Sequence, residues 1–339
     1  MDSGNNDPEI NNDKSMLQFE HFDVVQAEPT DHYYYQINSN KTKQQSFTNA
    51  NTPVYAKIMK EWKILSKNLP DSIYVRVYES RIDLLRAAIL GPAGTPYHDG
   101  IFFFDILLPY DYPKSPPKVY YRSHGYRLNP NLYKNGYVCL SLINTWSGKK
   151  IEKWTQESTL LQILVSIQGL VLNERPYFNE PGIRYFKDSK SCKWINRSIE
   201  YSEDAFVLSC KTMLQVRAKP PQNFEGFVAQ HFRDRAANIL AAIKVYHEGR
   251  VLVGQFHEMD NSDNNIACVK VSPRFKENLT RLHSQFKKVF PEVKCEPIIN
   301  VSISAENANK KAILSSNAKV NNKGFWGKLI SSFAKCFIP

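Results

Sequence analysis

Apolar residues recur with a helical period in one segment near the start of the chain. Between residues 55 and 69, the side chains of Ile58, Trp62 and Leu65 follow one another at intervals of three and four, the spacing that places them on one face of an α-helix. Pro70 comes directly afterwards and cannot continue a helix. The pattern therefore predicts an amphipathic helix that ends before Pro70.

Four short apolar runs come next, too short for helices and bounded by turn residues. They cover residues 73–77, 84–90, 101–108 and 118–121, and the Gly- and Pro-rich stretch GPAGTPYHDG separates the second from the third. Short runs with such connections favour an antiparallel meander of four strands. A helix followed by a meander and then by further helices predicts the α+β class.

Helical patterns dominate the second half of the chain. We expect a central helix over residues 159–172, and further helices over 198–216, 224–247 and 273–290. Residues 261–267 are typical of a loop or a weak strand. The predicted organisation is therefore a folded core over 51–217 with a helical extension over 218–290.

The two ends of the chain have a different composition. Residues 1–50 are rich in Asn, Asp, Ser and Gln, which predicts a disordered acidic and polar tail with a short docking segment at Phe19–Val25. Residues 291–339 are expected to be a polar linker followed by an amphipathic basic tail. In that tail, apolar residues such as Trp326 and Phe333 alternate with lysines such as Lys328. We expect weak binding to a membrane surface or a partner groove, or folding back onto the core.

Charge and cysteine content exclude several classes of protein. The formal net charge is +11, but residues 1–31 carry eight acidic side chains and one lysine, so the remainder carries about +18. A basic body attracts nucleic acid, anionic lipid or acidic protein. No aromatic RNA-binding signature or Arg-rich run accompanies the charge, so we expect no nucleic-acid partner. An acidic partner or a simply solvated charge excess remains.

The six cysteines show no metal-binding or disulfide spacing. There is no C-x-x-C pair among them, which favours a reducing compartment and no metal site. The N-terminus has no secretory signal pattern, and the most apolar run, residues 160–172, is too short and too polar to span a bilayer. We expect a cytoplasmic protein, with nuclear or membrane-peripheral locations as alternatives.

One cysteine stands in a distinctive context. Cys139 lies in LNPNLYKNGYVCLSLINTW, and the Pro-rich loop LLPYDYPKSPPKVYY precedes it. This order of strand, Pro-rich loop, Asn turn and single Cys resembles the core of ubiquitin-conjugating enzymes, and the colinear resemblance runs from about Pro53 to Arg217. The stretches CLSLINTW, LLQILVSIQGLVLNERPYFNEPG and FVAQHFRDRAANIL are similar to the large plant enzymes of the phosphate-starvation-regulator type and to the animal hybrid conjugating enzyme and ligase.

The resemblance implies a carrier role for Cys139. It would accept ubiquitin as a thioester from an activating enzyme and pass it to a substrate lysine, with no cofactor on this chain because the activating enzyme uses the ATP. Asn131, eight residues before the thiol, matches the Asn that stabilises the oxyanion in the family. The His of the family's His-Pro-Asn turn is replaced here by Asn129.

The family's group that assists the incoming amine has its match after the predicted central helix. Glu180 aligns best with the acidic or polar residue found just past the central helix, with Asn179 as the fallback and a solvated loop acid as the alternative. Tyr177 is expected to form an apolar wall beside the substrate lysine. These three residues are the candidate substrate-facing group.

Two departures concern partner binding. Lys114, in the loop that includes Pro116, stands where many members carry a Phe that contacts RING ligases, and Trp154 is followed by TQES in place of Ser-Pro-Ala. Interface energy is concentrated in such anchors, so we expect weak use of ordinary RING ligases and substrate choice either directly or through an unusual ligase.

Two other readings stay open. A non-catalytic ubiquitin-binding variant of the same fold would need neither Cys139 nor Asn131. A cysteine hydrolase would pair Cys139 with His98 or His124 as the base, although both histidines stand in polar turns where a solvated imidazole is common.

Overall fold

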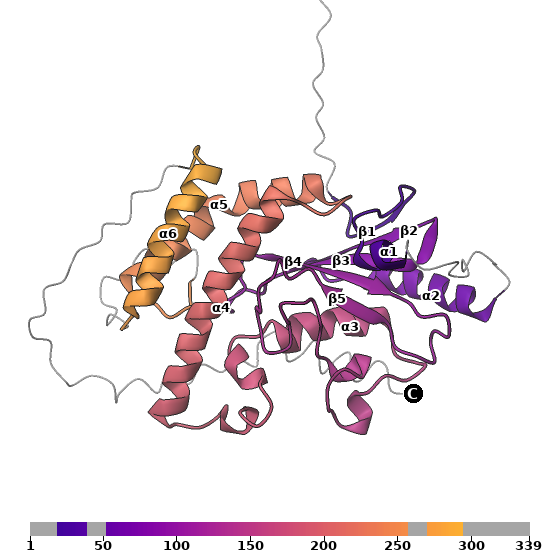
Figure 1. Cartoon of the computed structure of the whole chain (residues 1–339), viewed down its shortest axis with the longest axis horizontal. Coiled ribbons are helices and arrows are strands. Elements are labelled where there is room, and N and C mark those ends of the chain that lie inside the picture. The colour runs from indigo at the N-terminus through magenta and orange to yellow at the C-terminus, as the bar shows by residue number, and fades with distance from the viewer. Residues whose placement is uncertain (1–18, 39–51, 257–269, 294–339) are drawn as a thin grey trace, which may run out of the picture.

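One five-stranded sheet organises the chain (Figure 1). The computed structural model describes residues 19–38, 52–256 and 270–293. Strands β2 to β5 form the predicted antiparallel meander, and β1 pairs with β2 in parallel at the edge. The strands, in sheet order, are β1 (Phe22–Val25), β2 (Ile73–Tyr78), β3 (Arg81–Leu90), β4 (Ile101–Leu107) and β5 (Lys118–Tyr121).

The sheet is buried on both faces, which explains why its strands are almost continuously apolar. Every residue of β4, IFFFDIL, is buried. Phe102 and Phe104 belong to the core on one face, and Phe103 packs in a second core on the other. Strands covered on both faces need no polar alternation.

Two helices line the first face. Helix α2 (Pro53–Asn68) begins after Thr52, whose hydroxyl accepts a hydrogen bond from the backbone N–H of Tyr55, as N-cap residues do. Helix α3 (Leu160–Ser166) continues into a π-helical turn, Ile167–Val171. The predicted central helix is therefore confirmed in place, but its second half is wound more widely.

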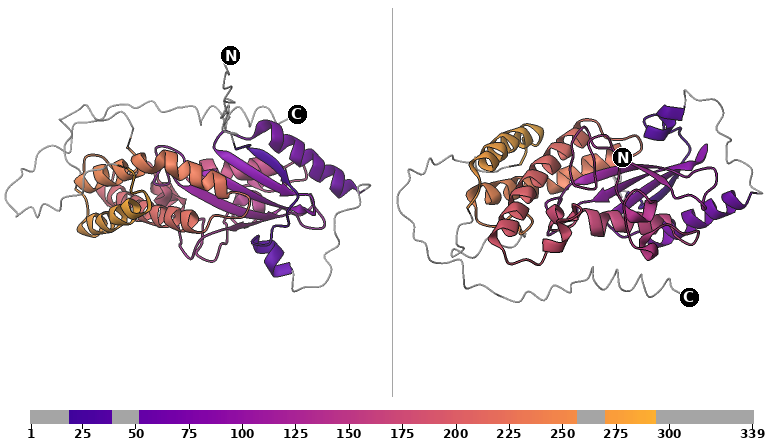
Figure 2. Two further views of the ribbon diagram at one scale, coloured as in Figure 1. Left: turned by 90° about the horizontal axis from the view of Figure 1, so that it is seen from above. Right: turned by 60° about the horizontal axis from the view of Figure 1, so that its bottom comes forward.

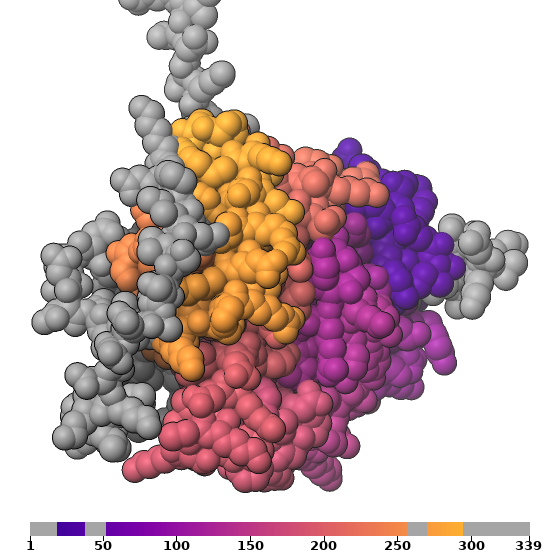
Figure 3. Space-filling model, turned by 60° about the vertical axis from the view of Figure 1, so that its left-hand side comes forward, coloured from indigo at the N-terminus to yellow at the C-terminus, as the bar shows by residue number. Residues whose placement is uncertain are grey.

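Three further helices pack around one end of the second face (Figure 2). They are α4 (Cys192–Ala218), α5 (Glu225–Glu248) and α6 (Pro273–Val289). Their apolar sides and three sheet residues, Ala88, Ile101 and Phe103, form one core. Figure 3 shows α6 (yellow-orange) on the outside of this unit, with the segment that leads into α4 below it. The helical extension is thus part of the folded body.

The prediction of a disordered tail is wrong for residues 19–38, and Phe19–Val25, suggested as a short docking segment of that tail, packs on the chain's own sheet and helices. Phe19 packs against Phe227, with ring centroids 4.9 Å apart, and β1 extends the sheet. A short helix, α1 (Tyr33–Asn38), lies on the second face at the end away from α4. Composition alone missed this because the segment is held by contacts with distant residues.

A buried charge cluster fixes this N-terminal segment to the sheet. The guanidinium of Arg86 donates to Asp105 at 2.6 Å and to Asp31 at 2.7 Å. Arg122 donates to the backbone oxygen of Asp31 at 2.8 Å, and the backbone N–H of Tyr33 donates to Asp105 at 2.9 Å. Each buried charge thus has a partner of opposite sign, as burial requires.

Several predicted features lie outside the described residues. They are the rest of the tail (1–18 and 39–50), the segment 261–267, and the linker and basic tail beyond residue 293. Among the helices that the structure describes, none has the length and apolar character needed to cross a bilayer.

Candidate functional site

Cys139 lies on an irregular segment between β5 and α3, paired to the Asn turn before it. Isolated bridges join Leu132 to Val138 and Asn129 to Leu132. The backbone N–H of Cys139 donates to the carbonyl of Asn131 at 2.9 Å, and the Asn131 side-chain amide donates to the carbonyl of Cys139 at 2.9 Å. The structure therefore brings Asn131 and Cys139 together, and Cys139 is buried, with 4% of its surface exposed.

Asn129, which stands where the family has a histidine, holds the turn in place through hydrogen bonds. Its side-chain amide is fully buried and donates to the hydroxyl of Tyr97 at 2.8 Å and to the carbonyl of Val171 at 2.7 Å. Its oxygen accepts from the backbone N–H of Asn131 at 2.8 Å. An amide thus supplies both donor and acceptor at the position of the family's histidine, and the turn stays anchored to the π-helical turn.

The amide of Asn131 has unused hydrogen-bonding capacity. Its Oδ1 is buried and has no hydrogen-bond partner in the part of the chain that the structure describes. A buried oxygen without a hydrogen-bond partner costs free energy. The side chain is therefore held by the hydrogen bond from its N–H group and not by its oxygen.

Three side chains control the charge state of the thiol. Burial raises the pKa of Cys139 above its ordinary value, while a hydrogen bond with Tyr133 and the positive charge of Arg127 lower it, and the negative charge of Glu180 raises it. The guanidinium of Arg127 lies 4.8 Å from the ring centre of Tyr133 and 3.6 Å from the Glu180 carboxylate. Sequence reasoning missed both residues: Tyr133 lies inside the quoted stretch around Cys139 but was given no role, and Arg127 directly precedes that stretch.

The predicted substrate-facing residues separate into different roles. Glu180 follows the short 3-10 helix η4 (Pro176–Asn179) and is the one of the three that acts on the thiol. Asn179 donates to the carbonyl of Val171 at 3.1 Å and accepts from Asn173 at 2.6 Å. Asn179 therefore serves to hold η4 against the π-helical turn, and this contact positions Glu180.

Tyr177 forms part of an aromatic wall. Its ring centroid lies 5.9 Å from that of Tyr201 on α4 and 5.4 Å from that of Phe178. The charges of Arg127 and Glu180 both influence the pKa of Tyr201, so the wall borders the ion pair. Burial is the main cause of the raised pKa of Tyr201, and its hydroxyl is protonated at neutral pH.

The predicted partner-binding residues come from two adjacent loops. The indole N–H of Trp154 donates to the carbonyl of Pro113 at 2.8 Å, and its ring packs 5.9 Å from Tyr112. Lys114 is exposed and Pro116 half-buried. Trp154 is itself buried, and its hydrogen bond holds the loop that carries Lys114. Two large side chains near these residues in the sequence, Tyr110 and Ile151, are 82% and 90% exposed.

Neither histidine considered as a hydrolase base contacts the thiol. His98 is bound to Asp99 at 2.6 Å and to the hydroxyl of Tyr246 at 3.0 Å, within the core of α4 and α5. His124 stands in a turn with φ of 49° and is not among the groups that influence Cys139. Over the described ranges, no group of three or more His, Cys, Asp or Glu residues is arranged to hold a metal ion.

Comparisons with known proteins point to one family. Residues 57–192 match the family model described as "Ubiquitin-conjugating enzyme". The chain is 43% identical to the putative ubiquitin-conjugating enzyme E2 38 of Arabidopsis thaliana, covering 87% of this chain and 90% of that one. It is 45% identical to the probable ubiquitin-conjugating enzyme E2 24 of the same plant, covering 84% of this chain but only 30% of the relative.

A hybrid protein is also similar. The human dual E2 ubiquitin-conjugating enzyme/E3 ubiquitin-protein ligase BIRC6 is 38% identical over 66% of this chain and 5% of its own length. The chain therefore spans less than a third of E2 24 and a small part of the hybrid, but nearly the whole of E2 38.

Proposed function

Because this chain belongs to the family of ubiquitin-conjugating enzymes, we propose that Cys139 carries ubiquitin as a thioester and passes it to a substrate lysine. The observation that carries the proposal is the pairing of Asn131 with the backbone of Cys139, next to a thiol whose pKa responds to two side chains of opposite charge. Asn131 lies across the Cys139 backbone, and the charges of Arg127 and Glu180 act on the Cys139 sulfur. A non-catalytic scaffold needs none of these groups near a cysteine.

The proposed reaction consists of two acyl transfers. In the first, the Cys139 thiolate attacks the carbonyl of the thioester held by an activating enzyme, a new C–S bond forms, and the activating enzyme's thiolate leaves. In the second, a neutral lysine amine attacks the Cys139 thioester and the amine gives up a proton. The C–S bond then breaks and Cys139 leaves as a thiolate. The Asn131 amide stabilises the oxyanion of each tetrahedral intermediate.

Glu180 is proposed to prepare the amine. A lysine arrives as an ammonium ion and must lose a proton before it can attack. Glu180 is paired with Arg127 at 3.6 Å, and both side chains are about half exposed, so an incoming ammonium can exchange with the guanidinium. The aromatic wall of Tyr177 and Tyr201 would restrict water around the amine and favour its neutral form.

The partners follow from this chemistry. Ubiquitin and an activating enzyme are required, and ATP is spent by that enzyme and not on this chain. At the position where many family members carry a Phe, the exposed cation of Lys114 does not offer the aromatic anchor that would bind a RING ligase tightly. We expect ordinary RING domains to stimulate discharge weakly; a strong stimulation by such a domain would contradict this part.

A non-reducing gel tests the function directly. After incubation with activating enzyme, ATP and ubiquitin, the wild-type chain should show a thiol-sensitive band one ubiquitin heavier. Cys139→Ala should show no band, and Cys139→Ser should show a band that resists thiols, because an ester replaces the thioester. Absence of all bands with a folded chain and a charged activating enzyme would favour the non-catalytic variant.

A further inference from the structure

A second surface, formed by residues 184–197, has a composition that the reaction at Cys139 does not explain. It comprises the 3-10 helix η5 (Arg184–Phe186), the loop after it and the first turns of α4. We call it the η5–α4 surface. It carries five basic side chains and one acidic one, Asp188. The basic residues are Arg184, Lys187, Lys190, Lys193 and Arg197.

The charges of the η5–α4 surface are not neutralised within the chain. Asp188 lies 3.9 Å from Arg175, which is outside the surface. Over the ranges that the structure describes, none of the five basic residues forms an ion pair with an acid; Lys193 and Arg197 instead lie 5.3 Å and 5.7 Å from the ring centre of Trp194. Five unpaired cations close together create a positive potential that attracts anionic groups.

Large apolar side chains are exposed among these cations. Tyr185 is 84% exposed and Ile195 45%. Phe186 stacks on Trp194, with centroids 4.3 Å apart and planes at 12°. An exposed apolar cluster rimmed by charge is typical of a protein-binding surface, and aromatic residues with arginine are the side chains enriched at such interfaces.

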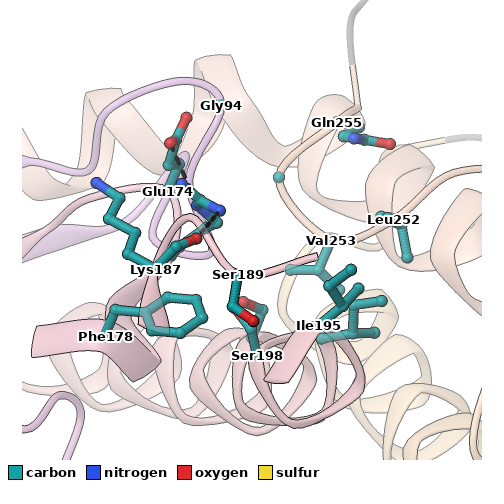
Figure 4. Close-up of a pocket in the computed structure, with 14 residues that line it drawn as sticks. Gly94, Glu174, Phe178, Lys187, Ser189, Ile195, Ser198, Leu252, Val253 and Gln255 are labelled. Atoms are coloured by element: carbon teal, nitrogen blue, oxygen red, sulfur yellow. Dashed lines mark hydrogen bonds and ion pairs between the residues drawn. The ribbon is translucent and has the colours of Figure 1, made fainter. Parts of the chain in front are cut away.

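The surface continues into a cavity of about 320 Å³. Ile195 and Ser198 of α4, Phe178 of η4 and Val253 of the loop after α5 come together around it (Figure 4). Lys187 stands at the cavity edge (Figure 4), and Ile195 belongs to both the cavity and the exposed cluster. The cavity is large enough for one or two apolar side chains, which a nucleic-acid backbone would not fill.

The position of the surface relates it to Cys139. Phe178, which lines the cavity, lies in η4 next to Tyr177 and two residues before Glu180. On α4, Ile195 precedes Tyr201 of the aromatic wall by six residues, about 9 Å along a helix axis. A segment bound on the η5–α4 surface would therefore hold its neighbouring lysines close to the thioester.

We propose that the η5–α4 surface binds acidic segments of protein substrates, with an apolar side chain of the segment in the adjoining cavity. The consequence of this binding, selection of the acceptor lysine, rests on the proposed function. Binding itself does not depend on that function. Charge complementarity identifies the segment as acidic, and the cavity identifies it as a peptide with an apolar anchor.

The first experiment measures binding without any ubiquitin. The probe is a fluorescein-labelled peptide of twelve residues with Asp and Glu around one central Leu and one Lys near its end. We expect the full chain to bind it in fluorescence anisotropy, and Lys190→Glu/Lys193→Glu to bind about tenfold more weakly. The matched control Lys270→Glu/Lys288→Glu makes the same change of charge at two exposed lysines flanking and within α6, and should bind as the wild type does.

Further variants separate a site from general attraction. Ile195→Ser should weaken binding of the Leu peptide but not of the same peptide with Ala in place of Leu. Lys190 lies just before α4 and Lys193 in its first turn, and glutamate near a helix N-terminus is favourable, so the charge-reversed variant should fold. The proposal would be overturned if the two double variants bound the peptide equally well. It would also be overturned if a single-stranded DNA of similar charge bound as tightly as the peptide and Ile195→Ser did not change its binding.

The second experiment tests the consequence. Wild type and variants are charged with ubiquitin and discharged onto the acidic Lys peptide and onto free lysine. We expect Lys190→Glu/Lys193→Glu to lose about tenfold in rate with the peptide only. If charging and discharge to free lysine are normal but the peptide is not preferred, the docking proposal fails and the function stands. If neither the wild type nor any variant is charged with ubiquitin, the proposed function fails. The binding measurement then still decides whether the surface binds acidic segments.

Discussion

Opposing effects act on the pKa of the Cys139 thiol: burial disfavours the thiolate, and two neighbouring groups stabilise the thiolate. Tyr133 donates a hydrogen bond and Arg127 supplies positive charge, while Glu180 opposes them. Because the ion pair of Arg127 and Glu180 lies beside the sulfur, a change in either partner should alter both thiol reactivity and lysine acceptance. The two effects can be measured separately.

Replacing Tyr133 by Phe should raise the pKa of the Cys139 thiol further. A hydrogen bond to a charged group contributes about 1.5–3 kcal/mol, so alkylation of Cys139 by iodoacetamide near pH 8 should slow by about tenfold or more, with the rate profile shifted to higher pH. Tyr137→Phe is the control, since Tyr137 lies 5.9 Å from Tyr133 but has no effect on the thiol pKa. An unchanged profile for Tyr133→Phe would contradict the role of its hydroxyl.

Replacing Glu180 by Gln should change two rates in opposite directions. Removing its negative charge lowers the pKa of the Cys139 thiol, so alkylation should become faster. Discharge of ubiquitin to lysine should become slower by at least about tenfold, because the amine loses its proton acceptor. A purely structural role for Glu180 would slow both reactions or neither.

At the scale of elements, the segment from β1 to α1 is attached to the sheet mainly by charge. Burial by itself would raise the pKa of Asp105, but His32, Arg86 and Arg122 lower it to about 2. The contribution of Asp105 to stability is therefore complete at neutral pH and is lost as the pH falls from its ordinary value of 3.8 toward about 2.

Asp105→Asn should lower the free energy of unfolding by about 3 kcal/mol, because Arg86 is left buried without its main counter-ion. The measurement is urea denaturation at pH 7, and hydrogen exchange should also show faster opening of the backbone N–H of Tyr33, which donates to Asp105. Asp188→Asn, at a fully solvated carboxylate, should change stability by less than about 0.5 kcal/mol. Equal stabilities would show that the cluster does not hold the segment.

At the scale of the molecule, the helical extension and the sheet share one core. Phe103 of β4 contacts Phe224, with ring centroids 5.1 Å apart, and the same core continues through Phe232 to α6. The helices should therefore unfold together with the sheet in a single transition.

Phe232→Ala should lower the unfolding free energy by about 3–5 kcal/mol, the usual cost of removing a buried Phe, and should keep one transition by both circular dichroism and tryptophan fluorescence. Ile151→Ala, at an exposed side chain, should have little effect. Two separate transitions in the wild type would mean that the extension is an independent unit.

The sequence by itself determined the features that depend on local order. The periods of the apolar residues located α2, the meander and the helices from α4 to α6, because helix and strand spacing repeats within a few residues. The link between Asn131 and Cys139 came from the resemblance of the surrounding stretch to ubiquitin-conjugating enzymes, and the structure brings the two residues together.

Features that join distant residues could not be predicted before the packed structure was known. The charges of Asp31, Arg86 and Asp105 neutralise one another across three separate segments, so the composition of residues 19–38 wrongly predicted disorder. Arg127 and Glu180 meet across 53 residues of chain, and their effect on Cys139 depends on burial as well as distance. Electrostatic energy and exclusion of water are properties of the packed arrangement, and no local pattern in the sequence specifies them.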